Sequence, residues 1–219
     1  FGMFSSISIR LFYLCGFIGV APIVFLIVLF VRIIRPWYLV RFGYFSADRI
    51  GHFAFDIEYY LKDISETKAC RGLDLFAFRG ELCNEQLGIM IRRKVVVHKV
   101  FLFFFQINKI LPGSDDHSVL PARVVNGSRD VAGKFSRFSQ SLSFTKEENL
   151  RGKRYLESLG MKTGDQFVCL MVRDSRYLEE LYPGVPGRGW DYHSYRDSKL
   201  ERYREAATFL ANEGCWVLR

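Results

Sequence analysis

Two short polar stretches of this sequence carry side chains suited to binding phosphate. The first directly follows the apolar run at residues 167–172 and consists of Arg173, Asp174 and Ser175. The second precedes a helical pattern and contains His193, Arg196 and Asp197. An arginine guanidinium can bond two phosphate oxygens at once, and the amino end of a helix attracts anions. The spacing therefore predicts a phosphate or nucleotide crevice at the carboxyl end of a strand in an open α/β sheet.

A third polar stretch follows the β-type run at residues 38–42 and contains Arg49, Gly51 and His52. Glycine lets the backbone approach a ligand closely, and histidine exchanges a proton near neutral pH. Because ligands bind beyond the carboxyl ends of the strands in such sheets, this position favours a role in binding or proton transfer.

Each stretch also has a purely structural interpretation. Gly51 and His52 could be a turn glycine beside a packing histidine, and Asp197 could serve only in a helix cap. Arg173 and Asp174 could form a buried salt bridge that holds their loop.

Alternating strand and helix patterns predict a parallel α/β sheet in the first half of the chain. Strands are expected at residues 38–42, 74–78 and 95–97, and helices at 55–62 and 85–92. The Phe-rich run from residue 100 fits a buried helix or a strand, and its continuation to residue 111, where Pro112 and Gly113 stop it, favours a helix. This order is typical of a parallel sheet with crossover helices. The following residues, 112–143, are rich in Ser, Gly, Asp and Arg and have little periodicity, which predicts a linker.

The second half shows helix-start signals. Thr145 and Glu148 have the spacing of a capping box, and Ser198 and Glu201 repeat it ahead of the last helical pattern. Apolar strands are expected before and after that last helix. Since the final strand stops at Arg219 with nothing to cover it, we expect a fragment whose second half is truncated.

An uncharged run from Leu11 to Val31 is long enough to span a bilayer as a helix. The residues that follow include Arg32, Arg35, Trp37 and Tyr38, a basic and aromatic collar typical of a membrane interface. The arginine excess after the run predicts a single-pass membrane protein whose soluble part is cytoplasmic. A cleaved signal peptide and a fully buried core helix stay open as alternatives.

Composition narrows the partners. The formal net charge of +8 favours anionic partners such as phosphates, nucleotide sugars or an anionic membrane face. The basic residues are scattered and no zinc finger, helix-turn-helix or RNA-binding signature is present, so nucleic acid is not expected. The 5 cysteines lack paired spacing, which argues for a reducing compartment and against a zinc site. No metal or other cofactor is expected.

Several blocks of this sequence resemble a family of predicted bacterial glycosyltransferases linked to surface polysaccharide synthesis. The blocks are residues 49–52, 144–148, 168–177, 192–198 and 214–219. The resemblance implies a GT-B fold, in which one Rossmann-like half holds the acceptor and the other holds a nucleotide sugar. The Arg173 strand end is also similar to the His-Leu-Arg block of fucosyltransferase-type enzymes, whose arginine faces the donor diphosphate. Met171 stands where that block would have its histidine.

The expected organisation is a membrane anchor at 1–35, an N-terminal Rossmann-like acceptor-side domain with a linker at 36–143, and the truncated start of a donor-binding domain at 144–219. The resemblance implies a membrane-anchored glycosyltransferase that moves a sugar from a nucleotide-sugar donor to a glycan or lipid-linked acceptor. The catalytic residues would be His52 and Arg173. The substrate-binding residues would be Arg49, Gly51, Asp174, Ser175, His193, Arg196 and Asp197.

Alternative functions belong to other classes. A non-catalytic scaffold could bind a nucleotide or glycan in the same crevice at the membrane surface. A phosphatase or kinase is disfavoured because the sequence has no P-loop and no nucleophile motif. Glycosyl transfer needs no metal where arginine and a helix end stabilise the leaving diphosphate, and no clear Asp-x-Asp motif is present. We expect this chain to be inactive without the remainder of the donor half.

Overall fold

The computed structural model describes residues 19–66, 72–137, 139–173, 176–181 and 195–219. The contacts of the chain divide it into two compact units. The first unit ends at Phe144 and the second unit is Thr145–Arg219.

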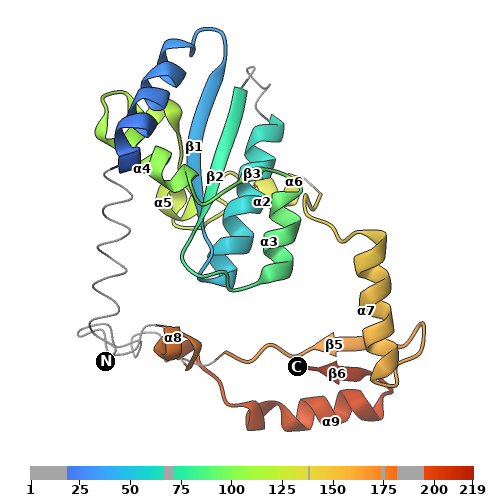
Figure 1. The fold of residues 1–219 in the computed structure, drawn as a ribbon. Helices are drawn as coiled ribbons and strands as arrows, with labels where there is room; N and C mark the ends of the chain where they lie inside the picture. The colour runs from blue at the N-terminus through green and yellow to red at the C-terminus, as the bar shows by residue number, and fades with distance from the viewer. Residues whose placement is uncertain (1–18, 67–71, 138, 174–175, 182–194) are drawn as a thin grey trace. The chain divides into compact units, whose positions relative to one another are not determined.

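A four-stranded parallel sheet forms the centre of the first unit, with strand order β3-β2-β1-β4 (Figure 1). The strands are β1 (Leu39–Ser46), β2 (Gly72–Arg79), β3 (Val96–Val97) and β4 (Ser118–Val119). Within the sheet, Phe42 pairs with Leu75 on one side and with Ser118 on the other. The prediction of a parallel α/β sheet is confirmed.

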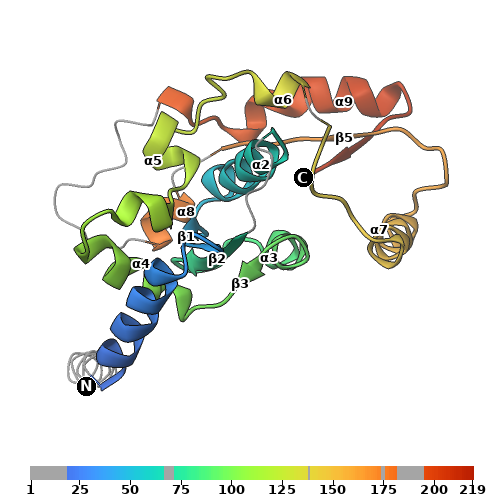
Figure 2. The same ribbon diagram turned by 90° about the horizontal axis from the view of Figure 1, so that it is seen from above.

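Helices cover both faces of this sheet (Figures 1 and 2). One face carries α2 (Ile50–Glu66) and α3 (Glu85–Arg92). The other carries the helix at residues 19–33 and α4 (Phe101–Ile110). The expected helices at 85–92 and 100–111 are therefore observed, and the expected helix at 55–62 lies inside α2.

Strand β1 supplies side chains to two cores because successive residues of a strand point to opposite faces. Phe45 is 1% exposed and stacks on Phe76, with ring centroids 4.5 Å apart, in the core shared with α2 and α3. Phe42 and Tyr44 enter the other core, where Tyr44 meets the edge of Phe105 on α4. Burial of these aromatic rings on both sides fixes the central strand.

The region expected to be a linker, 112–143, instead contributes to the first unit. It contains η1 (Ser114–His117), β4, α5 (Ala122–Asn126) and α6 (Lys134–Arg137). Strand β4 pairs with β1 over two residues, which is too short to show a hydrophobic period.

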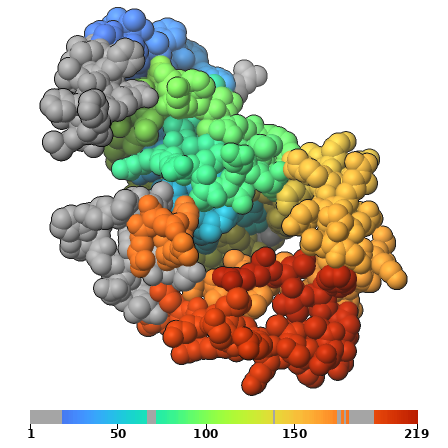
Figure 3. Space-filling view, turned by 60° about the horizontal axis from the view of Figure 1, so that its bottom comes forward, coloured from blue at the N-terminus to red at the C-terminus, as the bar shows by residue number. Residues whose placement is uncertain are grey.

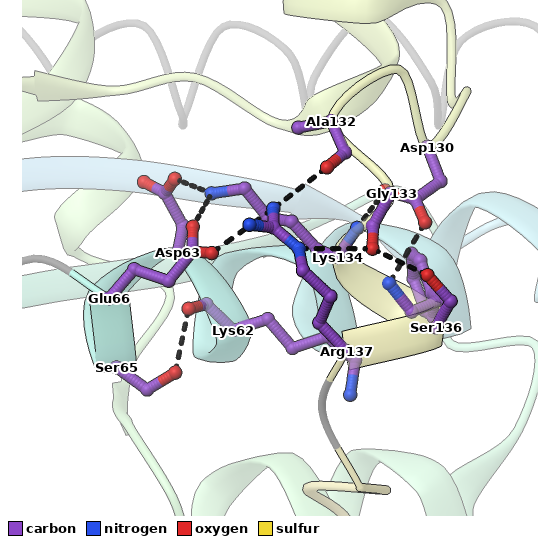
Figure 4. Close-up of polar contacts among 11 residues, drawn as sticks. Lys62, Asp63, Ser65, Glu66, Asp130, Ala132, Gly133, Lys134, Ser136 and Arg137 are labelled. Carbon is purple, nitrogen blue, oxygen red and sulfur yellow. Dashed lines mark hydrogen bonds and ion pairs between the residues drawn. The ribbon is translucent and has the colours of Figure 1, made fainter.

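Ion pairs hold α6 against the end of α2 (Figure 4). The buried Lys134 ammonium contacts the carboxylates of Asp63 and Glu66, the latter at 2.9 Å. Arg137 also reaches Glu66, at 3.2 Å. A shared carboxylate that orders two cations restrains the segment more than an isolated surface pair would.

The helix at residues 19–33 packs side-on against the sheet. Val24, Val28 and Val31 are buried against β1 and α4. In its described part, the predicted membrane span therefore has one face covered by protein. A helix that crosses a bilayer alone would contact lipid on all sides. Residues 11–18 of that span lie outside the described residues. Among the helices described, none combines the length and the apolar character needed to cross a bilayer.

The second unit contains two parallel strands with helices between them in the sequence. Its elements are α7 (Lys146–Ser158), β5 (Phe167–Cys169), α8 (Arg176–Leu181), η3 (Leu200–Tyr203), α9 (Arg204–Asn212) and β6 (Trp216–Leu218). Strands β5 and β6 pair in parallel, with Phe167 opposite Trp216. The second unit is thus described only as a small α/β element.

The capping box at the start of α7 is confirmed. Thr145 Oγ1 accepts from the Glu148 backbone N–H at 3.2 Å, and the Glu148 carboxylate accepts from the Thr145 N–H at 2.8 Å. The prediction of a second capping box at Ser198 and Glu201 is wrong, because the N-cap residue of η3 is Lys199 and it makes no side-chain cap. The Ser198 backbone N–H instead donates to the carbonyl of Arg173 at 3.0 Å, which ties Ser198 to the loop that follows β5.

Candidate functional site

The order of the strands reverses between β1 and β4. After β1 the chain proceeds through β2 to β3, and α4 then returns it to the opposite side of β1. Ligands of open α/β sheets bind outside the carboxyl ends of the strands at such a switch point. We call the polar residues and the glycine at this position the switch-point site. They are Arg49, Gly51, His52, Asp56, Arg123 and Ser128.

His52 lies in the first turn of α2, and its Nδ1 is 2.9 Å from the hydroxyl of Ser128. Partial burial, together with the positive charges of Arg123 and Arg49, lowers the pKa of His52 below its ordinary 6.5, while Asp48 acts in the opposite direction. The ring is therefore neutral at neutral pH. A neutral imidazole can accept a proton, which a base in this position must do.

Ser128 has an unusual backbone conformation. It follows Gly127, the left-handed cap of α5, and has a positive φ of 58° itself. A non-glycine residue in this region carries a cost of about 1–3 kcal/mol, and such strain often marks a functional position. In Ser128 it accompanies a hydroxyl directed at His52.

Asp56 lies one helical turn after His52, on the same side of α2. Its side chain is 1% exposed, and Oδ1 accepts from the backbone N–H of Arg123 at 3.0 Å. The other oxygen, Oδ2, is buried and has no hydrogen-bond partner among the residues that the structure describes. Burial raises the pKa of Asp56 from 3.8 to about 6, although the bond from Arg123 opposes the rise.

Arg49 and Gly51 flank Ile50, the first residue of α2. The sequence placed this stretch after a strand, as observed, but as a turn ahead of the helix rather than at its first residues. A Cβ added at Gly51 would meet no atom within 4 Å. Crowding by the protein therefore does not require glycine there. The open space lies instead at the amino end of a 17-residue helix, where exposed N–H groups and the dipole attract anions.

The second unit brings together part of the predicted phosphate site. Arg173 Nε lies 3.7 Å from Asp197 Oδ1, so the ion pair joins the loop after β5 to the segment before η3. Strand β5 ends at Cys169, so Arg173 does not directly follow the strand as predicted. Arg173 Nη1 is buried and has no hydrogen-bond partner among the described residues. The Arg196 guanidinium lies over the Tyr195 ring, 5.7 Å from its centroid. Asp174, Ser175 and His193 lie outside the described residues.

A hollow of about 360 Å³ at the amino ends of the strands is a rival site. Two of its charged side chains are paired with each other, because Arg41 makes hydrogen bonds of 2.7 and 2.6 Å to the Asp74 carboxylate. Tyr60 donates to the same carboxylate at 2.6 Å, and burial and Asp74 both raise its pKa. This cluster is best explained as structural, since its charges satisfy each other.

Sequence reasoning missed Asp56, Arg123 and Ser128. Asp56 had a readable signal, since it follows His52 by one helical turn, but the other two depend on how α5 docks. Across the ranges that the structure describes, no group of three or more His, Cys, Asp or Glu side chains is placed to hold a metal ion.

Comparison of the chain with models of protein families, with curated proteins and with solved structures gives no match.

Proposed function

We propose that the protein is a glycosyltransferase of the two-halved GT-B type and that the switch-point site binds its acceptor. The observation that carries the proposal is the neutral His52, which lies at the sheet's switch point with Nδ1 beside the Ser128 hydroxyl. A ligand-binding position, a base in the correct charge state and a partner that orients the base are thereby combined in one place.

The chemistry assigned to His52 is removal of a proton from the acceptor hydroxyl. When Nδ1–H donates to Ser128 Oγ, the Nε2 lone pair is left for the acceptor. The acceptor oxygen then bonds to the anomeric carbon as its proton moves to Nε2. The bond from that carbon to the nucleoside diphosphate breaks, and the diphosphate leaves with the electron pair.

Positive charge around His52 indicates an anionic acceptor. The charges of Arg123 and Arg49 act on the histidine more strongly than the opposing charge of Asp48, and α2 has no acidic residue in its first turn. A glycan or lipid-linked acceptor that carries phosphate would match this field. Arg173 in the second unit is assigned to the donor diphosphate, because Nη1 has no protein partner among the described residues.

The test uses the full-length enzyme, a panel of uridine- and guanosine-diphosphate sugars, and a lipid-linked phosphate acceptor. His52→Ala should lower the transfer rate roughly a hundredfold or more, which is the usual contribution of a general base. Ser128→Ala should cause a smaller loss, and the exposed Arg129→Ala serves as the matched control that leaves transfer unchanged. Normal transfer by folded His52→Ala would refute the role of His52.

The second candidate is a binding protein without catalysis, and one observation favours it. Asp197 is ion-paired with Arg173, so a donor diphosphate has to compete with a carboxylate. Calorimetry separates the two functions. Binding of a nucleotide sugar that Arg173→Lys weakens supports the transferase, since an ammonium cannot replace the planar fork. Binding of acidic glycan with no binding of nucleotide sugar supports the scaffold.

A further inference from the structure

The helix at residues 19–33 is apolar on two opposite faces. Its inner face, which includes Val24 and Val28, is buried in the core of the first unit. The outer face consists of side chains that are 41–69% exposed, namely Ile23, Leu26, Ile27, Phe30 and Ile33. These positions recur every three or four residues, so they form one continuous stripe. The space-filling view shows this helix, in blue, at the surface of the first unit (Figure 3).

The helix is fixed to the unit at its carboxyl end. Arg32 donates to the side-chain oxygen of Asn108 at 2.7 Å and to the carbonyl of Pro112 at 2.5 Å. Arg35 pairs with Asp116 at 2.8 Å. Because Asn108 is fully buried and ties α4 to η1, the outer face has a defined direction relative to the sheet.

The chemistry of the outer face fits lipid better than protein. Residues 19–31 contain no side chain that can donate or accept a hydrogen bond. Protein interfaces usually carry about one hydrogen bond per 100–200 Å², whereas a hydrocarbon surface needs none. Trp37 (75% exposed) and Tyr38 (39% exposed) follow the stripe, and these residue types prefer the boundary between hydrocarbon and headgroups. The sequence before the helix is also uncharged back to Leu11.

We propose that the outer face of the helix at residues 19–33 docks the first unit on a lipid bilayer, with the helix axis along the membrane surface. The sheet occupies the inner side, so only the outer stripe enters the boundary between headgroups and acyl chains. The arginines next to the stripe are engaged with Asn108, Pro112 and Asp116. Docking therefore relies on apolar contact, and neutral phosphatidylcholine suffices for it.

Flotation of the whole chain with phosphatidylcholine vesicles tests the proposal. Wild-type protein should float with the vesicles. Leu26→Asp/Phe30→Asp should reduce the bound-to-free ratio roughly tenfold or more, because two carboxylates must then enter the apolar boundary. The matched control is Val131→Asp/Phe209→Asp, which adds the same charge at residues that are 76% and 64% exposed and should float as the wild type does.

Circular dichroism and the urea midpoint show whether the outer-face variant is folded, and Leu26→Ser/Phe30→Ser replaces it if it is not. Sedimentation without lipid tests a second copy as the occupant. Flotation that these outer-face variants leave intact, or absence of flotation of the wild type, overturns the proposal. A dimer that they dissociate without change in flotation overturns it too and assigns the face to self-association.

Discussion

At the scale of single residues, Asp56 is the group whose ionisation should matter most for stability. Burial raises its pKa from 3.8 to about 6, so the folded protein keeps a proton that the unfolded chain has released. This group therefore favours folding most below its unfolded pKa, and its contribution is lost as the pH rises to about 6. Asp56→Asn removes the titrating carboxyl group, so the variant does not lose this contribution to its free energy of unfolding as the pH rises. The free energy of unfolding of the variant minus that of the wild type should rise by roughly 2 kcal/mol from pH 4 to pH 7.

Urea unfolding at several pH values measures this difference. His52 has the opposite effect, because a lowered pKa makes its contribution fall as the pH falls below 6.5, but it is present in both proteins and drops out of the difference. Glu157→Gln, which removes an exposed carboxylate on α7, should give a difference that does not change with pH. A constant difference for Asp56→Asn would contradict the assignment of its pKa.

How far the site could be predicted depends on how local its contacts are. Arg49, Gly51 and His52 were found because their position after a strand is visible in the sequence. The bond from His52 to Ser128 joins residues 76 apart, and the bond from Asp56 to Arg123 joins residues 67 apart. No local pattern encodes such contacts, since they form only when α5 docks on α2. The left-handed conformation of Ser128 could not be predicted either, because this conformation is common for glycine and rare for serine.

At the scale of elements, the capping box of α7 makes a measurable claim. Thr145→Ala removes the acceptor for the Glu148 N–H and leaves that orphan amide to water. The second unit should lose roughly 1 kcal/mol of unfolding free energy, the usual cost of such a change. Chemical denaturation followed by helical circular dichroism measures it. Thr145→Ser keeps the hydroxyl and should restore most of the loss, and equal destabilisation by both changes would show that the cap is not the cause.

Elements were predictable where the signal is both local and repeated. Helix α4 was identified because its apolar run ends at a Pro-Gly stop, and α7 because a capping box marks its start. Strand β4 was missed since two paired residues cannot show alternation. The inner face of the helix at residues 19–33 was also missed, because a uniformly apolar run does not reveal which side the sheet covers. The capping box predicted at Ser198 and Glu201 does not form, because the Ser198 backbone N–H donates to the Arg173 carbonyl instead of to the Glu201 side chain.

At the scale of the whole molecule, the two units differ in how much they bury. In the first unit, Phe42, Phe45 and Phe76 are each at most 1% exposed. Among the described residues of the second unit, Met161 is the buried apolar side chain, and α7 and α9 bury none. Phe167 and Val168 on β5 are 47% and 40% exposed. Apolar burial supplies most of the stabilisation of a fold, so the second unit, as described, should open far more easily.

Amide hydrogen exchange of this chain tests that contrast. Backbone amides of β1 and β2 sit between two cores and should exchange only through large openings of the first unit. Amides of β5 and β6 are bonded in a two-stranded sheet whose side chains are exposed on β5 and half-buried on β6, so local opening suffices to expose them. After correction for intrinsic rates, protection of β1 and β2 should exceed that of β5 and β6 by roughly a hundredfold or more. Equal protection would mean that β5 and β6 are stabilised by contacts beyond the described residues, and the weakness assigned to the second unit would be wrong.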